Sequence, residues 1–123
     1  MINLRVKTEY SFRHAYGKIK DVIASQGEYA TITDRNNTFG HIPFWNECKK
    51  QNKKPILGVE LGLVQDVNLK VRQTTYYITL IAKNQQGLSS LYKLVSLSTK
   101  QENHLALDSI SEIDENIIII IQD

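Results

Sequence analysis

KPILGVELGLV, residues 54–64, is the stretch that decides the fold. Ile56 to Val64 is strongly apolar and contains one charge, Glu60. An apolar run of this length indicates a strand buried on both faces, as found inside α/β sheets. Gly40–Gln51 before it fits a helix with Pro43 in its first turn, where the missing N–H costs little. We expect this helix to turn inward the face that carries Ile42, Trp45 and Cys48.

The residues before this helix predict a further strand–helix–strand unit. Alternating apolar and polar residues at the start indicate a half-buried strand, and helical spacing follows it. The expected elements are a strand over Ile2–Val6, a loop over Thr8–Gly17, a helix from Ile19 that ends by Gly27, a strand at Tyr29–Ile32 and a polar turn at Asp34–Asn37.

The residues after Val64 continue the alternation of strands and helices. Thr74–Ala82 is β-branched and aromatic, which favours a strand. The other expected elements are a polar connection or hairpin tip at Gln65–Gln73, a helix over Gln86–Lys100, a loop over Gln101–Ser109, a turn from Asp108 or Ser109 through Ile113, and a buried strand at Ile117–Ile121.

This order of elements predicts an α/β fold with a mostly parallel sheet and flanking helices. No linker divides residues 1–123, so we expect a single domain. The last strand ends two residues before the end of the chain, although a buried strand normally has neighbours on both sides. We therefore expect a part of a larger sheet or barrel, or a partner that covers the open strand edge.

Composition excludes several classes of protein. The chain has 123 residues, 41% hydrophobic and 23% charged, which suits one globular domain. Its net charge of +2 is too small to indicate nucleic-acid binding by itself. The single cysteine excludes a disulfide framework. Without an apolar leader or a membrane-length apolar run, the chain is expected to be cytoplasmic.

Two acids are the candidates for a common functional centre, because functional groups gather at the carboxyl ends of strands in α/β sheets. Asp34 follows the strand at residues 29–32, and Glu60 lies within the apolar strand. Structural roles are open for both: Asp34 as a turn or helix-capping residue, and Glu60 as the ion-pair partner of Arg5, Lys7 or Arg35.

Other candidate residues give weaker signals. None of His14, His41 and His104 belongs to a closely spaced histidine pair, so each is expected to be a surface or capping residue. Trp45 is expected in a core or a packing interface. A basic run could contact phosphates or could simply be a solvated helix end; it consists of Lys49, Lys50, Lys53 and Lys54.

Three segments resemble the start of bacterial DNA polymerase III α subunits, which open with a PHP (polymerase and histidinol phosphatase) domain. They are LRVKTEYS at 4–11, TITDRNNTFGHIPFWNECKKQNKKPILGVELGL at 31–63 and YYITLIAKNQQGLSSLYKLVS at 76–96. The most specific parts are residues 54–60 and 82–87, which are similar to the family's K-P-I-x-G-x-E and A-K-N-x-x-G motifs. The resemblance covers nearly the whole chain and implies the N-terminal portion of a distorted (β/α) barrel.

The resemblance also implies a degenerate metal site. In active relatives, His, Asp and Glu side chains hold metal ions that hydrolyse phosphoesters. The corresponding positions here keep two acids but have lost their histidines; they are Asn3, Arg5, Lys7, Asp34, Arg35, Glu60 and Tyr77. Lys and Arg have no free lone pair at neutral pH, so we expect no bound metal, no cofactor and no catalytic residue, with cations in place of the metals.

The implied role is a structural or protein-interaction module in DNA replication. Its expected partners are a polymerase body, a proofreading exonuclease-like subunit, or a second copy that pairs through the C-terminal strand. Two alternatives remain open from the sequence. One is a surviving metal-dependent phosphoesterase that uses Asp34, Glu60 and His14. The other is a small nucleic-acid-binding adaptor that uses the four lysines.

Overall fold

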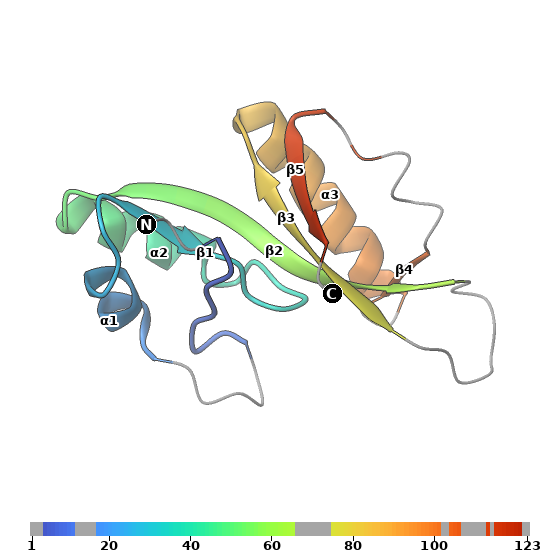
Figure 1. Cartoon of the computed structure of the whole chain (residues 1–123), viewed down its shortest axis with the longest axis horizontal. Helices are drawn as coiled ribbons and strands as arrows, with labels where there is room; N and C mark the ends of the chain where they lie inside the picture. Colours follow the sequence, from blue (N-terminus) through green and yellow to red (C-terminus); the bar gives the residue numbers. More distant parts are fainter. Residues whose placement is uncertain are drawn as a thin grey trace.

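A long curved strand, β2 (Lys54–Val64), runs through the middle of the molecule and carries strands on both of its edges (Figure 1). The computed structural model describes residues 4–11, 17–65, 75–101, 104–106, 113 and 115–121. Its other elements are α1 (Ile19–Ala24), β1 (Tyr29–Ile32), α2 (His41–Lys50), β3 (Tyr76–Ala82), α3 (Gln85–Lys100), β4 (His104–Ala106) and β5 (Ile117–Ile121).

The strands form an open, mixed sheet in the order β1-β2-β3-β5, with β4 also paired to β2. β1 and β4 are parallel to β2, whereas β3 is antiparallel to β2 and β5 is antiparallel to β3. The prediction of a mostly parallel sheet is therefore wrong. Residues 65–75 between β2 and β3 are fewer than the dozen or so that a crossover to a parallel strand needs, so these strands are antiparallel neighbours.

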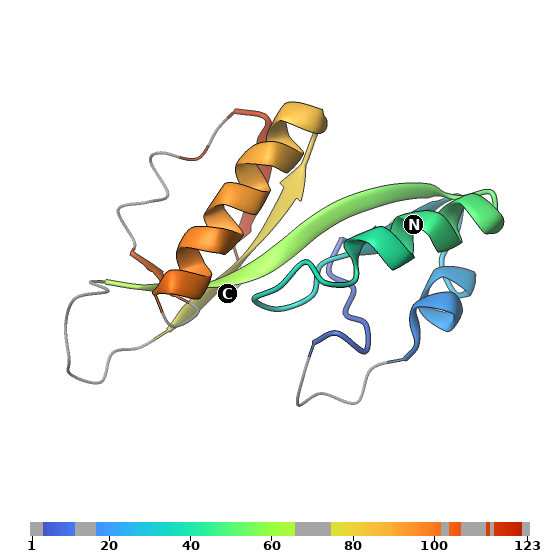
Figure 2. The same ribbon diagram turned by 180° about the vertical axis from the view of Figure 1, so that it is seen from behind.

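Two hydrophobic clusters lie along β2, one beneath each long helix. The first contains Ile23, Ile32, Phe44 and Cys48. The second lies between α3 and the sheet and contains Val59, Leu61, Leu63, Leu80, Leu91 and Leu105. Seen from behind, α2 and α3 cover the same face of the sheet (Figure 2). Because side chains alternate along a strand, the residues between Val59, Leu61 and Leu63 point to the opposite face.

The predicted inward face of α2 is wrong for Ile42 and Trp45 and correct for Cys48. His41, Phe44 and Cys48 are buried, while Ile42 is 75% and Trp45 is 42% exposed. The apolar pattern misled the prediction because the imidazole of His41 is buried through hydrogen bonds, which a search for apolar spacing cannot detect.

Three other expectations need correction. Residues 4–8 form no strand, because the Thr33 hydroxyl accepts the Val6 N–H at 2.8 Å and so replaces a ladder bond. β4 lies within the expected loop over 101–109. β5 is an edge strand among the described residues, and only Ile117 of its five isoleucines is buried. The Asn3 position, the His14 loop and the predicted turn at 108–112 lie outside the described residues. No helix in the described part is long and apolar enough to cross a membrane.

Candidate functional site: a buried ion-pair cluster

The carboxylate of Glu60 is the centre of a buried cluster on the sheet face opposite α3. Glu60 is 2% exposed, and each of its oxygens meets a cation. Lys7 Nζ lies 3.2 Å from one oxygen, and Arg35 Nε lies 2.5 Å from the other. The pairing predicted for Glu60 is thus confirmed for Lys7 and Arg35, while Arg5 lies at the surface of the same N-terminal segment.

The backbone brings these three side chains together. Residues 4–11 begin beside the end of β1 (Figure 1), and the Thr33 N–H donates to the Val6 carbonyl at 2.7 Å. After β1 the chain continues along β2, where Arg35 bridges to Glu60. Asn36 takes a left-handed φ of 62°, which asparagine tolerates, and its N–H donates to the Glu60 carbonyl at 2.8 Å.

Tyr77 completes the cluster from β3. The guanidinium carbon of Arg35 lies 4.1 Å from the centre of the Tyr77 ring. This is a cation–π contact, which the planar guanidinium of arginine makes well by stacking on an aromatic face. The Arg35 side chain remains 33% exposed, whereas the Lys7 side chain is only 12% exposed and also donates to the Thr33 carbonyl. Arg35 is therefore fixed on both sides, by an anion and by an aromatic face.

Asp34 is buried beside this cluster but is held by neutral donors. It is 1% exposed and accepts hydrogen bonds from the Thr8 N–H at 2.5 Å, the Thr8 hydroxyl at 2.6 Å and the Ser11 hydroxyl at 2.7 Å. It does not cap α2, which has no side-chain cap. Sequence patterns do not predict this role for Thr8 and Ser11, because two hydroxyls more than twenty residues away form no motif with an acid.

Burial and charge shift the pKa values of Glu60 and Lys7. Burial raises the pKa of the Glu60 carboxyl, but the hydrogen bond from Arg35 and the charge of Lys7 outweigh it, so the pKa falls below its usual range. Burial also lowers the pKa of the Lys7 amine, and the attraction of Glu60 does not fully offset this effect. Glu60 is consequently ionised at neutral pH, with its counter-charges supplied by the chain.

The described side chains of the cluster do not fit a metal ion. Both oxygens of Glu60 and both oxygens of Asp34 already accept hydrogen bonds or ion pairs. Lys7 and Arg35 have no lone pair to offer a metal. Within the described ranges, no three His, Cys, Asp or Glu side chains gather as a possible ligand set.

The four lysines of the basic run do not share one open face. The Lys53 amine donates to the carbonyls of Ile23 and Gln26 at the end of α1, which caps that helix. Lys54 pairs with Glu28, and the Lys49 amine lies 3.5 Å from the centre of the Trp45 ring. Lys50 is exposed at the last residue of α2.

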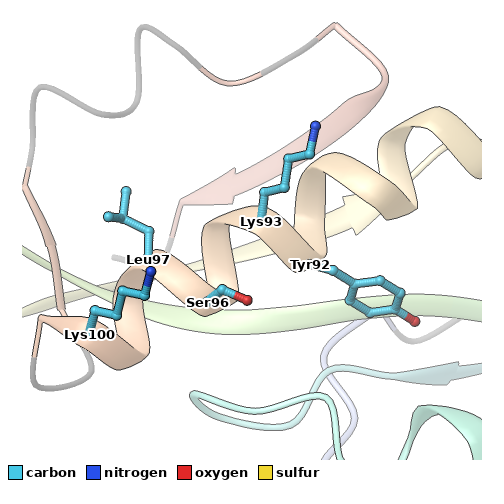
Figure 3. A pocket seen from close by; sticks show the side chains of 5 residues that line it. All are labelled: Tyr92, Lys93, Ser96, Leu97 and Lys100. Carbon is cyan, nitrogen blue, oxygen red and sulfur yellow. The ribbon is translucent and has the colours of Figure 1, made fainter.

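A shallow pocket of about 350 Å³ lies apart from the cluster, on α3 (Figure 3). Its lining side chains all come from that helix; they are Tyr92, Lys93, Ser96, Leu97 and Lys100. Figure 3 shows Tyr92 leaving the helix in a different direction from Lys93. The lining contains no carboxylate or imidazole, so the pocket brings together no acid–base pair.

His41 joins the two helices through this same Tyr92. Its Nε2 lies 2.8 Å from the Gly58 carbonyl, and its Nδ1 lies 2.9 Å from the Tyr92 hydroxyl. Because a carbonyl can only accept, Nε2 carries the proton, and Nδ1 accepts from the hydroxyl. Burial lowers the pKa of the imidazole, and the Gly58 hydrogen bond and the Asp34 charge oppose this effect only in part.

We predict that the free energy of unfolding falls as pH decreases below about 6.5, the pKa of an exposed histidine. The unfolded chain then binds a proton that folded His41 resists, so acid favours unfolding; above that pH the effect is absent. Urea denaturation between pH 7 and 5 measures this slope. His41→Gln should flatten it. An unaltered slope in His41→Gln contradicts the prediction.

Comparison with known proteins identifies relatives of the whole described fold. The PHP domain family matches residues 3–121. The chain is 34% identical over 106 residues to the DNA polymerase III subunit alpha of Borreliella burgdorferi, across 79% of this chain and 9% of that protein. It is 35% identical over 102 residues to that of Helicobacter pylori strain 26695, across 78% of this chain and 8% of that protein. A Buchnera aphidicola subunit of the same name is 28% identical over 129 residues and matches 97% of this chain.

Proposed function

The chain belongs to the PHP domain family, and we propose that it is a non-catalytic, structural PHP module of a replicative DNA polymerase of the polymerase III α type. The matched region lies in relatives named as that subunit, of which it spans about a tenth. The proposal treats residues 1–123 as a single domain, part of a larger distorted barrel, and places it in the cytoplasm.

The ion-pair cluster is the observation that supports the proposal. Glu60 would be a metal ligand in an active relative, but here its two oxygens are occupied by Lys7 and Arg35. Tyr77 and Arg35 stand at further metal positions and contact each other. Cations attached to the chain keep the local charge balanced without providing an activated water, so the cluster stabilises the fold and supplies no hydrolytic chemistry.

We predict that the purified protein contains well under one Zn²⁺ or Mn²⁺ per chain and hydrolyses no generic phosphoester. The physical reason is that ligation would require both cations to leave a buried carboxylate. Elemental analysis after dialysis against each metal measures the content, and p-nitrophenyl phosphate hydrolysis with and without chelator measures the activity. Stoichiometric metal that is lost in Glu60→Gln, or chelator-sensitive hydrolysis, would instead establish the phosphoesterase that uses Asp34, Glu60 and His14.

The partners we propose are proteins: the polymerase body or a proofreading exonuclease-like subunit. Self-association through β5 is the alternative, because Ile118 is 40% and Ile121 is 73% exposed on that edge strand. The arrangement of the lysines does not favour the nucleic-acid adaptor, since Lys49, Lys53 and Lys54 all contact other groups of the chain.

A further inference from the structure

Three large apolar side chains are exposed within seven residues at the start of α2. Phe39 is 67%, Ile42 is 75% and Trp45 is 42% exposed. We call these residues, with Lys49, the α2 ridge. Figure 2 shows α2 on the outside of the molecule, over the sheet. Single exposed apolar residues are ordinary, but a contiguous group of large ones marks an interaction site.

The α2 ridge is held rigidly rather than exposed on a loose loop. The Asn37 side chain is buried; its oxygen accepts the Phe39 N–H at 3.1 Å, and its amide donates to the Tyr10 carbonyl at 2.8 Å. The helix is anchored from its other face by Phe44 and Cys48, which are fully buried. A preorganised surface loses little entropy when a partner binds.

The charges around the α2 ridge specify the partner's chemistry. The Lys53 amine is turned to α1, so Lys49 and Lys50 are the cations beside the ridge, and Glu47 is the one acid among residues 37–53. Lys49 lies against the Trp45 ring, and Lys50 is exposed beside it at the C-terminal end of the helix. Such a surface attracts carboxylates at its edge and excludes water at its apolar centre.

We propose that the α2 ridge docks a protein segment whose apolar side chains are flanked by Asp or Glu. This inference rests on the proposed role as an interaction module and specifies its binding surface. A protein segment is favoured over nucleic acid for two reasons. Lys49 already covers a face of the only tryptophan, which removes a stacking platform for a base. In addition, the side chains of Phe39 and Ile42 have no hydrogen-bond donor that could bind a phosphate.

The test selects binders from a random peptide library displayed on phage, with the full chain immobilised. Tryptophan-free versions of the selected peptides are then titrated while Trp45 fluorescence is recorded. We expect peptides enriched in acidic and large apolar residues. Their affinity should fall about tenfold in Ile42→Ser and again in Lys49→Glu, as for residues central to an interface. Both side chains are exposed, so the variants should fold.

Leu97→Ser is the matched control, because Leu97 is 40% exposed on α3 and lies outside the α2 ridge; it should bind as the unaltered chain does. The proposal is overturned if no peptide is selected, if the peptides lack acids, or if Ile42→Ser binds them equally well. An oligothymidylate that changes Trp45 fluorescence and competes with the peptides would assign the surface to nucleic acid. Each of these failures leaves the metal and hydrolysis results standing, so the two proposals fail separately.

Discussion

Glu60→Gln is expected to lower the free energy of unfolding by about 3 kcal/mol, the lower end of what breaking a buried ion pair costs. The amide leaves Lys7, whose side chain is 12% exposed, charged among buried groups. Arg35 is 33% exposed and keeps its contact with Tyr77, so it can regain water, and the loss stays below the upper limit. Urea denaturation at pH 7 measures the difference.

Glu28→Gln is the matched control, because it also removes a carboxylate from a lysine, at a pair whose side chains are 68% and 64% exposed. Exposed pairs contribute little, so this change should have almost no effect on the free energy of unfolding. If the two variants lower the free energy of unfolding equally, the ion pairs of Glu60 contribute no more than an exposed pair does. Replacing Glu60, Lys7 and Arg35 together by Leu and Met should recover much of the loss, since no charge then remains unpaired.

The contribution of Glu60 has a defined pH window. Its pKa is lowered in the folded state, so the unfolded chain takes up the proton first as acid is added. The stabilisation is complete above the unfolded pKa of about 4.3 and is lost as pH falls through the folded value. This window lies below the one expected for His41, and the two groups can be separated by their variants.

Gly58→Ala is expected to destabilise the protein by about 3 kcal/mol, the upper part of the range for overpacked sites. A methyl group at this position would meet the Leu80 carbonyl of β3, the Ile81 side chain at 2.7 Å and the Thr33 side chain at 3.1 Å. The nearest obstacle is backbone, which cannot rotate away. The free energy of unfolding from urea denaturation measures the effect.

Gly27→Ala provides the control for this change. A methyl group there has no neighbour within 4 Å, so it should be neutral or stabilise slightly by restricting the unfolded chain. Gly58 also begins the part of β2 that pairs with β3. If Gly58→Ala unfolds at the same urea concentration as the unaltered chain, β2 and β3 do not approach as closely as described.

The spacing of apolar residues predicts those helices and strands that do not depend on distant parts of the chain. α3 has a clear apolar stripe and an Asn84 cap that accepts the Gly87 N–H at 2.9 Å. β2 is apolar enough to be recognised without its neighbours. β4 was missed because its three residues become a strand only through pairing with Gly62–Val64. Strand direction was mispredicted for the same reason, since it depends on connections and not on composition.

The sequence predicts which acids belong to the candidate site, but it does not predict most of the contacts that they make. Strand ends indicated Asp34 and Glu60, and the nearby cations suggested partners for Glu60. Nothing local could assign Thr8 and Ser11 to Asp34, because chain reversal brings them there. The prediction of a surface or capping residue is likewise wrong for His41, which is buried and whose two ring nitrogens join β2 to α3.

The cations that neutralise Glu60 are tethered to the same chain. A dissolved counter-ion stabilises a fold in proportion to its free concentration, so such a fold weakens when that ion becomes scarce. Lys7 and Arg35 act at an effective concentration set by chain geometry, which no change in the medium can dilute. If the proposed function is correct, we expect the fold to withstand chelation of metal ions and to lose the stabilisation from Glu60 only in acid.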